Sequence, residues 1–315
     1  MNGFFPAHLV EPTSQLSDEQ IIEMFLATYH QSRYTLRNYR RAIEQFRSFV
    51  HYKPLKNVTW KDIEAYKMGL ILGVCSIQRK KHLPATVASL IAPLRSLYKW
   101  GSDPNIGIFQ HNPTSTLRTP KIAVTSKNHY LTKREVHLLL RELKRQGIRD
   151  YLIGLSLVLL GLRVSELLSI QWGHFHPDPS ETCMWLTVVN GKGGRRREVK
   201  VPAVLWKYLE FYRHNLGVDE SAASTDQPVF TISLRQVQRV IKQAAAGSNL
   251  NKKVTPHWLR HTNATLALLS GASLQQVQEN LGHAHINTTQ RYLHTVEQLQ
   301  KAAPDYVEAY LGDLV

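Results

Sequence analysis

Helix-start signals followed by apolar residues at intervals of three and four recur along most of the 315-residue chain. The segment from Ser17 to Gln20 can form a capping box, in which two side chains satisfy free backbone amides at the first turn of a helix. The apolar stripe from Leu36 to Val50 is typical of a helix with one face in a core. The segment from Thr132 to Glu135 repeats the capping pattern. A chain patterned in this way is predicted to fold mainly into α-helices.

A stretch rich in Gly, Pro, Ser, Thr and Asn, from 101 to 129, interrupts the helical pattern and is typical of a linker. We therefore predict a helical first domain over 1–112, a linker over 113–129 and a second domain over 130–315. In the second domain, 185–189 and 197–201 alternate like strands on either side of Gly193-Gly194, which predicts a β-hairpin. The predicted fold class is mainly α with a small β-sheet.

The chain is strongly basic, with a formal net charge of +15 and an isoelectric point near 9.8. Up to residue 115 there are 14 Lys and Arg against 8 Asp and Glu, a net of +6, and the remainder has 25 against 16, a net of +9. Because both parts are basic, double-stranded DNA is the predicted partner. The alternative is a surface charge that only keeps the protein soluble.

The sequence also predicts where the protein works. Cys75 and Cys183 lie far apart and form no motif, so we expect reduced thiols. The first residues lack the basic region and apolar stretch of a signal peptide. The apolar segment 151–162 is too short to cross a bilayer. We expect a cytoplasmic, nucleoid-associated protein with no membrane partner.

Four short motifs stand out for their chemistry: G-L-R-V-S-E-L, N-G-K-G-G-R, P-H-W-L-R-H-T and L-G-H-A-H-I-N-T-T-Q-R-Y. Their functional residues are Arg163, Lys192, His257, Arg260, His283 and Tyr292. Cations and imidazoles can stabilise an anionic phosphoryl transition state that a phenol attacks, with no metal or other cofactor. A guanidinium suits a phosphate because it presents two parallel donors.

The region around His257 can bind either an anion or a metal. Thr255 and Pro256 predict a helix start, which places His257 and Arg260 in a first turn whose backbone amides attract anions. His261 lies four residues after His257, a spacing that also suits a metal site. Because no carboxylate cluster follows, we expect no metal and assign His261 either to packing or to support of the functional residues.

For three of these residues, a role without catalysis is the alternative. Arg163 and Glu166 can form an ion pair on one helical face, in which Glu166 orients the guanidinium. Lys192 can be a basic hairpin tip that touches only phosphates. Tyr292 is one of 13 tyrosines, most of which are expected in half-buried core positions.

Taken together, the order of the motifs and the spacing of Tyr292 from L-G-H resemble the tyrosine recombinase (phage-integrase-like) family, in its simple Xer- or Cre-type layout. The resemblance implies a helical core-binding domain and a catalytic domain that close on DNA as a clamp. It implies that Tyr292 attacks a phosphodiester to give a 3′-phosphotyrosine, that Lys192 protonates the leaving 5′-oxygen and that His283 donates to the phosphate. Tyr306 and Tyr310 are the other candidate nucleophiles.

The resemblance further implies four protomers on paired inverted-repeat sites, passing through a Holliday junction and joined by exchange of a C-terminal helix. Side chains expected to contact DNA in such an assembly are Arg37, Arg40, Arg41, Arg95, Arg195, Arg196 and Arg197. Two rival functions stay open at this point. A type IB topoisomerase would use a similar site as a monomer, and a DNA-binding regulator would leave the six functional residues without a role.

Overall fold

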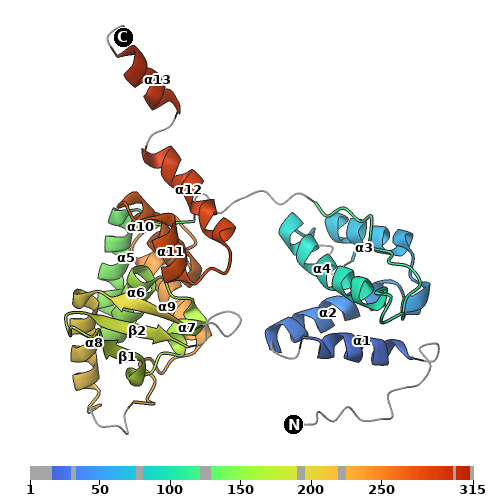
Figure 1. Ribbon diagram of the computed structural model, residues 1–315, viewed down its shortest axis with the longest axis horizontal. Coiled ribbons are helices and arrows are strands. Elements are labelled where there is room, and N and C mark those ends of the chain that lie inside the picture. Colours follow the sequence, from blue (N-terminus) through green and yellow to red (C-terminus); the bar gives the residue numbers. More distant parts are fainter. Residues whose placement is uncertain are drawn as a thin grey trace. The chain divides into compact units, whose positions relative to one another are not determined.

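The computed structural model describes residues 16–29, 33–75, 81–120, 129–189, 196–218, 225–300 and 303–312. The chain divides into two compact units, Met1–Ala123 and Val124–Val315. Figure 1 shows a wholly helical first unit and a second unit in which helices surround a small sheet. The predicted fold class, mainly α with a small β-sheet, is confirmed.

In the described residues of the first unit, the helices are α1 (Asp18–Ala27), α2 (Arg33–Phe49), the 3-10 turn η2 (Leu55–Asn57), α3 (Trp60–Leu72) and α4 (Pro84–Gly101). The predicted capping box is present at Ser17, and Thr59 forms a second one at the start of α3. The inward faces meet in one core, in which Phe25, Phe46 and Tyr66 are almost fully buried. α4 continues past Pro93, which lies inside the helix.

The second unit contains most of the chain's helices: α5 (Lys133–Gln146), α6 (Ile148–Leu160), α7 (Val164–Leu168), η4 (Trp172–His174), α8 (Ala203–Asn215), α9 (Leu234–Gly247), α10 (Pro256–Leu269), α11 (Leu274–Leu281), α12 (Ile286–Gln300) and α13 (Ala303–Leu311). α6 is buried on nearly every side and packs against α5, α8 and α10. This apolar helix therefore forms the centre of the unit.

The sheet is antiparallel in the order β1-β2-β3, with β1 at Phe175–Pro177, β2 at Met184–Val188 and β3 at Arg197–Val201. The predicted pairing of the second and third strands is confirmed, with Leu186 opposite Val199 on the buried face. The first strand was not predicted, because three residues are too few to show alternation.

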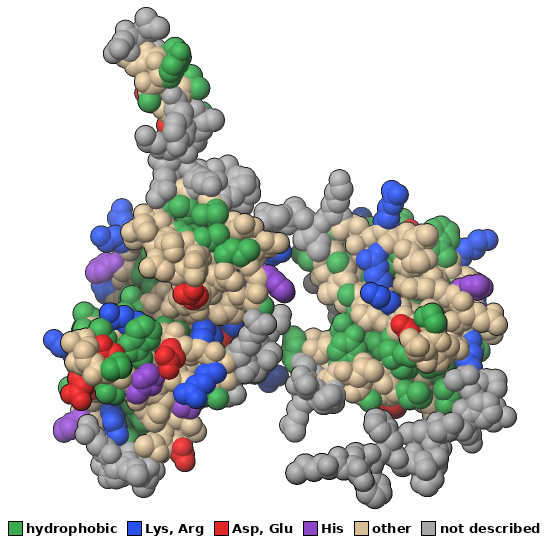
Figure 2. All heavy atoms as spheres, in the orientation of Figure 1, with side chains coloured by type: hydrophobic (Ala, Val, Ile, Leu, Met, Phe, Trp, Pro, Cys, Tyr) green, Lys and Arg blue, Asp and Glu red, His purple; other side chains and the backbone are tan. Residues whose placement is uncertain are grey.

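The C-terminal part consists of two successive helices. α12, which carries Tyr292, runs for 15 residues. α13 follows, and its apolar residues Val307 and Tyr310 are 56 % and 89 % exposed. Figure 2 shows Lys and Arg side chains on the visible face of each unit. No helix in the described ranges is both long and apolar enough to cross a membrane.

Candidate active site

Arg163 lies at a sharp break between two helices. Gly161 ends α6 in the left-handed conformation, with φ of 62°, and Arg163 is the N-cap of α7. Its backbone amide donates to Glu166 Oε2 at 2.8 Å, and its Nη1 donates to Glu166 Oε1 at 2.6 Å. The expected pairing of Arg163 with Glu166 is therefore present, and it fixes the guanidinium.

Glu166 is surrounded by three arginines. Its side chain is fully buried, and Arg197 binds it with both terminal nitrogens, at 3.0 and 2.9 Å. Arg260 Nη1 lies 3.8 Å from Glu166 Oε2. Burial would raise the pKa of Glu166, but hydrogen bonds from Arg197 and Arg163 keep it below its usual value. Three cations against one carboxylate leave a net positive cluster that suits an anionic phosphate.

Arg260 connects the ends of two helices. It lies in the first turn of α10, whose N-cap is Thr255, and it is only 2 % exposed. Its two terminal nitrogens donate to the carbonyls of Gly161 and Leu281, each at 2.5 Å. Burial and then the nearby Arg163 lower its pKa to about 10. The guanidinium therefore stays charged at neutral pH.

His257 and His261 face each other at one end of the cluster, with their Nε2 atoms 2.9 Å apart. One Nε2 must donate and the other accept. His261 Nδ1 is buried with no hydrogen-bond partner, and a bare lone pair costs less there than an unpaired N–H. We therefore assign the shared proton to His261, which leaves His257 with its proton on Nδ1. Burial, followed by the charge of His257, lowers the pKa of His261 to about 4.

Tyr292 lies between two imidazole rings. The ring of His261 contacts it edge-on at 5.2 Å, and the ring of His283 is nearly parallel to it at 6.4 Å. His283 follows Gly282, which ends α11 at φ of 63°, and its Nδ1 lies 2.9 Å from Thr289 Oγ1. Burial raises the pKa of Tyr292, while Arg260, Arg291 and Arg163 act against that rise. Burial and then Arg260 lower the pKa of His283 to about 4.

The structure therefore brings together five of the six predicted chemical residues: Arg163, His257, Arg260, His283 and Tyr292. Lys192 and Arg195 lie outside the described residues. His285, two residues after His283, is exposed. Within the described ranges, no group of three or more His, Cys, Asp or Glu side chains could hold a metal ion.

Arg197 is not where the sequence interpretation placed it. We expected it to contact the DNA backbone, but its guanidinium is bound to Glu166 and to the Asn280 carbonyl. The reason is the alternation of β3, since Arg197 shares a face with Val199 and Val201, both buried. That alternation was visible in the sequence and would have predicted an inward-facing side chain.

The remaining arginines expected to contact DNA fall into different settings. Arg95 donates to the Leu117 carbonyl, so this guanidinium is already held within the first unit. Arg40 pairs with Glu23, with Nη2 2.8 Å from Oε2, and Arg37 lies over the ring of Tyr34 at 5.5 Å. Arg196 is exposed.

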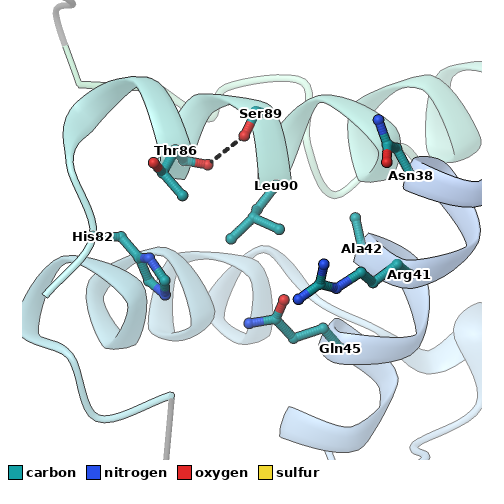
Figure 3. Close-up of a pocket in the computed structure, with 8 residues that line it drawn as sticks. All are labelled: Asn38, Arg41, Ala42, Gln45, His82, Thr86, Ser89 and Leu90. Atoms are coloured by element: carbon teal, nitrogen blue, oxygen red, sulfur yellow. Dashed lines mark hydrogen bonds between the residues drawn. The ribbon is translucent and has the colours of Figure 1, made fainter. Parts of the chain in front are cut away.

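Arg41 lines a hollow of about 640 Å³ on the first unit, which we call the α2–α4 hollow (Figure 3). The polar side chains that line the hollow come from α2, from α4 and from the segment before α4. The lining residues are Asn38, Arg41, Ala42, Gln45, His82, Thr86, Ser89 and Leu90. Arg, Asn and Gln are the residue types that read base edges in a DNA groove. The periodicity that predicted these helices gave no sign of the hollow.

Two residues of the site were missed as contributors to it. Asn280 accepts from Arg197, and Thr289 is buried beside His283. His261, expected to pack or to support the site residues, contacts Tyr292 as well as His257. Thr289 lies in one of the four motifs but had been given no role there. The contact of Asn280 with Arg197 on β3 joins positions 83 residues apart.

Two protein-family models match this chain, one in each of its two units. The model of the phage integrase family matches residues 129–298, and that of the phage integrase N-terminal SAM-like domain matches residues 19–108. A tyrosine recombinase of Thermosipho africanus is 29% identical over 289 residues, which cover 89% of this chain and 96% of the relative. A tyrosine recombinase of Pseudothermotoga lettingae is 31% identical over 248 residues, covering 78% and 80%.

The solved structures show the same fold. A lambda integrase (75–356) dimer bound to a COC′ core site superimposes with a TM-score of 0.66 at 20% identity, covering 88% of this chain and 95% of the other. At this identity the likeness concerns the fold of the chain.

Proposed function

The chain belongs to the phage integrase family and is a tyrosine recombinase, an enzyme that cleaves and rejoins DNA at specific sites; from this premise we propose that Tyr292 is its nucleophile. The observation that carries the proposal is the position of the Tyr292 ring against the rings of His261 and His283. Arg163 and Arg260, held by Glu166 beside them, supply the charge that a scissile phosphate requires.

In the proposed reaction, the phenol oxygen of Tyr292 attacks the phosphorus of a DNA phosphodiester. The bond from phosphorus to the 5′-oxygen breaks, which leaves a 3′-phosphotyrosine and a 5′-hydroxyl. Lys192 gives a proton to the leaving oxygen, and the His257–His261 pair accepts the phenol proton. A 5′-hydroxyl of the partner strand then reverses the step. Because the adduct keeps the bond energy, the reaction uses neither a nucleotide cofactor nor a metal.

The charges around the phosphate support these roles. A phenol ordinarily loses its proton near pH ~10, so it attacks slowly unless cations stabilise the phenolate and a base removes the proton. Burial raises the pKa of Tyr292 overall, while Arg260, Arg291 and Arg163 act against that rise and favour the phenolate. The lowered pKa values of His261 and His283 keep both rings neutral at pH 7 but also make them weak bases, so proton transfer to the His257–His261 pair depends on cations that stabilise the phenolate.

The proposed substrate is double-stranded DNA with paired inverted-repeat core sites, bound by both units. We assign the α2–α4 hollow to DNA contact, because Arg41 and Asn38 are exposed there and the half-buried Gln45 adds a further side chain of the right chemistry. The proposed active assembly is a homotetramer that passes through a Holliday junction. Exchange of α13 between protomers would cover the exposed Val307 and Tyr310. Such an enzyme would work in the cytoplasm on the nucleoid.

The test is formation of a covalent protein–DNA adduct by Tyr292→Phe. The substrate is DNA with paired inverted-repeat core sites, sought in the DNA that flanks the gene and nicked so that the adduct accumulates. Removing the hydroxyl leaves the ring and its packing in place, so binding should stay within about threefold and the adduct should disappear. Gel electrophoresis under denaturing conditions measures the adduct.

Tyr306→Phe and Tyr310→Phe are the matched controls, because these tyrosines lie nearest in sequence to Tyr292. Both should still form the adduct. An adduct with Tyr292→Phe, or its loss in either control alone, would assign the nucleophile elsewhere.

A further inference from the structure

A short segment at 129–131, just ahead of α5, packs against the first turn of α10. The ring of His129 is stacked on the ring of Trp258, with the centroids 4.8 Å apart and an angle of 23° between the planes. Trp258 lies in that first turn, next to His257 and two residues before Arg260. The stack therefore joins a residue from a distant part of the sequence to the turn that carries two of the proposed site residues.

The same segment holds Trp258 a second time, through its backbone. The Leu131 amide donates to Thr262 Oγ1 at 2.9 Å, and Thr262 Oγ1 donates in turn to the Trp258 carbonyl at 2.8 Å. Leu131 and Thr262 are both fully buried. A buried amide that lost its acceptor would cost about 1–3 kcal/mol, so this relay resists displacement. Trp258 is thereby held at its ring and at its carbonyl.

Lys252, four residues ahead of α10, gives the segment a third point of attachment. Its Nζ donates to the Tyr130 carbonyl at 3.3 Å and lies 5.9 Å from the centre of the Tyr130 ring. The same Nζ donates to Glu135 Oε2 at 2.8 Å, and Glu135 belongs to the capping box of α5. Three successive residues, His129, Tyr130 and Leu131, therefore contact α10 or the residues just before it.

His129 is also close enough to influence the proton-accepting pair. Burial lowers the pKa of His257, and the charges of two site arginines and then of His129 lower it further. His129 likewise contributes to the lowered pKa of His261, after burial and the charge of His257. His129 therefore lies at the edge of the active site, within electrostatic reach of both imidazoles.

We propose that His129 is a positioning residue, whose stack on Trp258 fixes the position of His257 in the active site. The inference rests on the proposed function, in which the His257–His261 pair accepts the phenol proton. A base must lie within hydrogen-bond reach of the proton that it takes, and a misplacement of about 1 Å can cost ~100-fold in rate. The alternatives are a contact of His129 with a DNA phosphate, proton transfer by His129 itself and a role in stability alone.

The deciding comparison is between His129→Ala, which removes the stack, and His129→Phe, which keeps a ring on Trp258 and removes both ring nitrogens. Single-turnover cleavage of the nicked core-site DNA is measured with the full-length enzyme at saturating concentration, beside its affinity for the same DNA. His129→Ala should cleave about 10- to 100-fold more slowly than the wild type, with its affinity unchanged within about threefold. His129→Phe should restore the rate. His137→Ala, at an exposed histidine of α5, is the matched control and should behave as the wild type does.

Each alternative gives a different result. A rate for His129→Phe as low as that for His129→Ala would overturn the inference, because the imidazole itself would then take part in the reaction. Weaker binding with a normal rate at saturation would also overturn it, since a contact with a DNA phosphate would explain that result. Normal rates and affinities in both variants would show that His129 has no role in cleavage.

A double-mutant cycle separates positioning from stability. In a His257→Ala background, His129→Ala should cause no further loss of rate, because the base that it positions is absent. An equal loss in both backgrounds would indicate a general structural effect and would overturn the inference. Trp258→Leu breaks the same stack from its other side, and it takes the place of His129→Ala in the cycle if thermal melting shows that His129→Ala is unfolded.

The cycle also distinguishes failure of the inference from failure of the proposed function. If His257→Ala is slow and His129→Ala is not, the proposed role of His257 stands and the inference fails. If His257→Ala cleaves at the rate of the wild type, the proposed role of His257 fails and the inference fails with it. The assignment of the nucleophile depends on neither result, because the adduct test of Tyr292→Phe is separate.

Discussion

Glu166 shows how a single residue sets the charge of the site. An unpaired carboxylate buried in a protein is strongly unfavourable, but this one has Arg163, Arg197 and Arg260 around it. The same pairing restrains the guanidiniums, which would otherwise repel one another. Glu166 therefore lets three cations lie close together while leaving enough net charge to attract a phosphate.

This arrangement predicts the effect of Glu166→Gln. The amide keeps the shape of the side chain but removes the charge, and loss of one partner of a buried ion pair costs about 3–5 kcal/mol. The free energy of unfolding in urea should fall by that order. Glu23→Gln is the control, because Glu23 and Arg40 are 59% and 55% exposed and such pairs contribute about 1 kcal/mol or less. Equal losses in the two variants would contradict the importance of burial.

The stability difference between the wild type and Glu166→Gln is also expected to depend on pH. Arg197 and Arg163 hold the pKa of Glu166 below its usual 4.5, against the rise that burial alone would cause. A carboxylate with a lowered folded-state pKa stabilises the protein above its usual pKa and loses that effect as the pH falls. The stability difference between wild type and Glu166→Gln should therefore be full above about pH 4.5 and shrink below it.

At the scale of helices and strands, local signals predicted much of the fold. The predicted capping boxes at Ser17 and Thr132 and the predicted pairing of β2 with β3 are all present, because each depends on residues close in sequence. What the sequence did not reveal depends on distant neighbours. Arg197 meets Glu166 from 31 positions away, and no local pattern specifies that partner. The ring contact of His261 with Tyr292 is another such case.

α13 is a short helix with exposed apolar side chains. It has nine residues, a length that is marginal for a helix without tertiary contacts, and Tyr310 on it is 89% exposed. Under the proposed helix exchange, a protein truncated after Lys301 should bind one site as a monomer but form no cooperative dimers or synapses. Gel-shift titration on single and paired sites measures this directly.

Point variants separate assembly from folding in this prediction. Tyr310→Ser should weaken cooperative binding, whereas Phe211→Ser, on the exposed face of α8, should leave it unchanged. Truncation that unfolds the second unit would show that α13 packs on its own protomer. Intact recombination after truncation would show that α13 is not needed for assembly.

For the whole molecule, the distribution of charge matters more than any one contact. Both compact units are basic, and Lys and Arg side chains are visible on each in Figure 2. Binding of many cations to DNA releases counterions, so affinity falls steeply with salt, by a slope of about 0.9 for each phosphate neutralised. This electrostatic part of binding does not require the recognition sequence and can be measured on any duplex.

Arg41 and Arg40 make this expectation specific, because they are adjacent on α2 and differ in their partners. Arg40 is paired with Glu23, whereas Arg41 lines the α2–α4 hollow. Arg41→Gln should therefore reduce the salt slope of DNA binding by about 1, as expected for loss of one phosphate or base-edge cation. Arg40→Gln should change it much less, since its charge is already offset by Glu23. Fluorescence anisotropy of one labelled duplex across a NaCl series measures both slopes. If the two variants lower the slope equally, the contribution of the first unit is a diffuse surface charge and the hollow has no particular role in holding DNA.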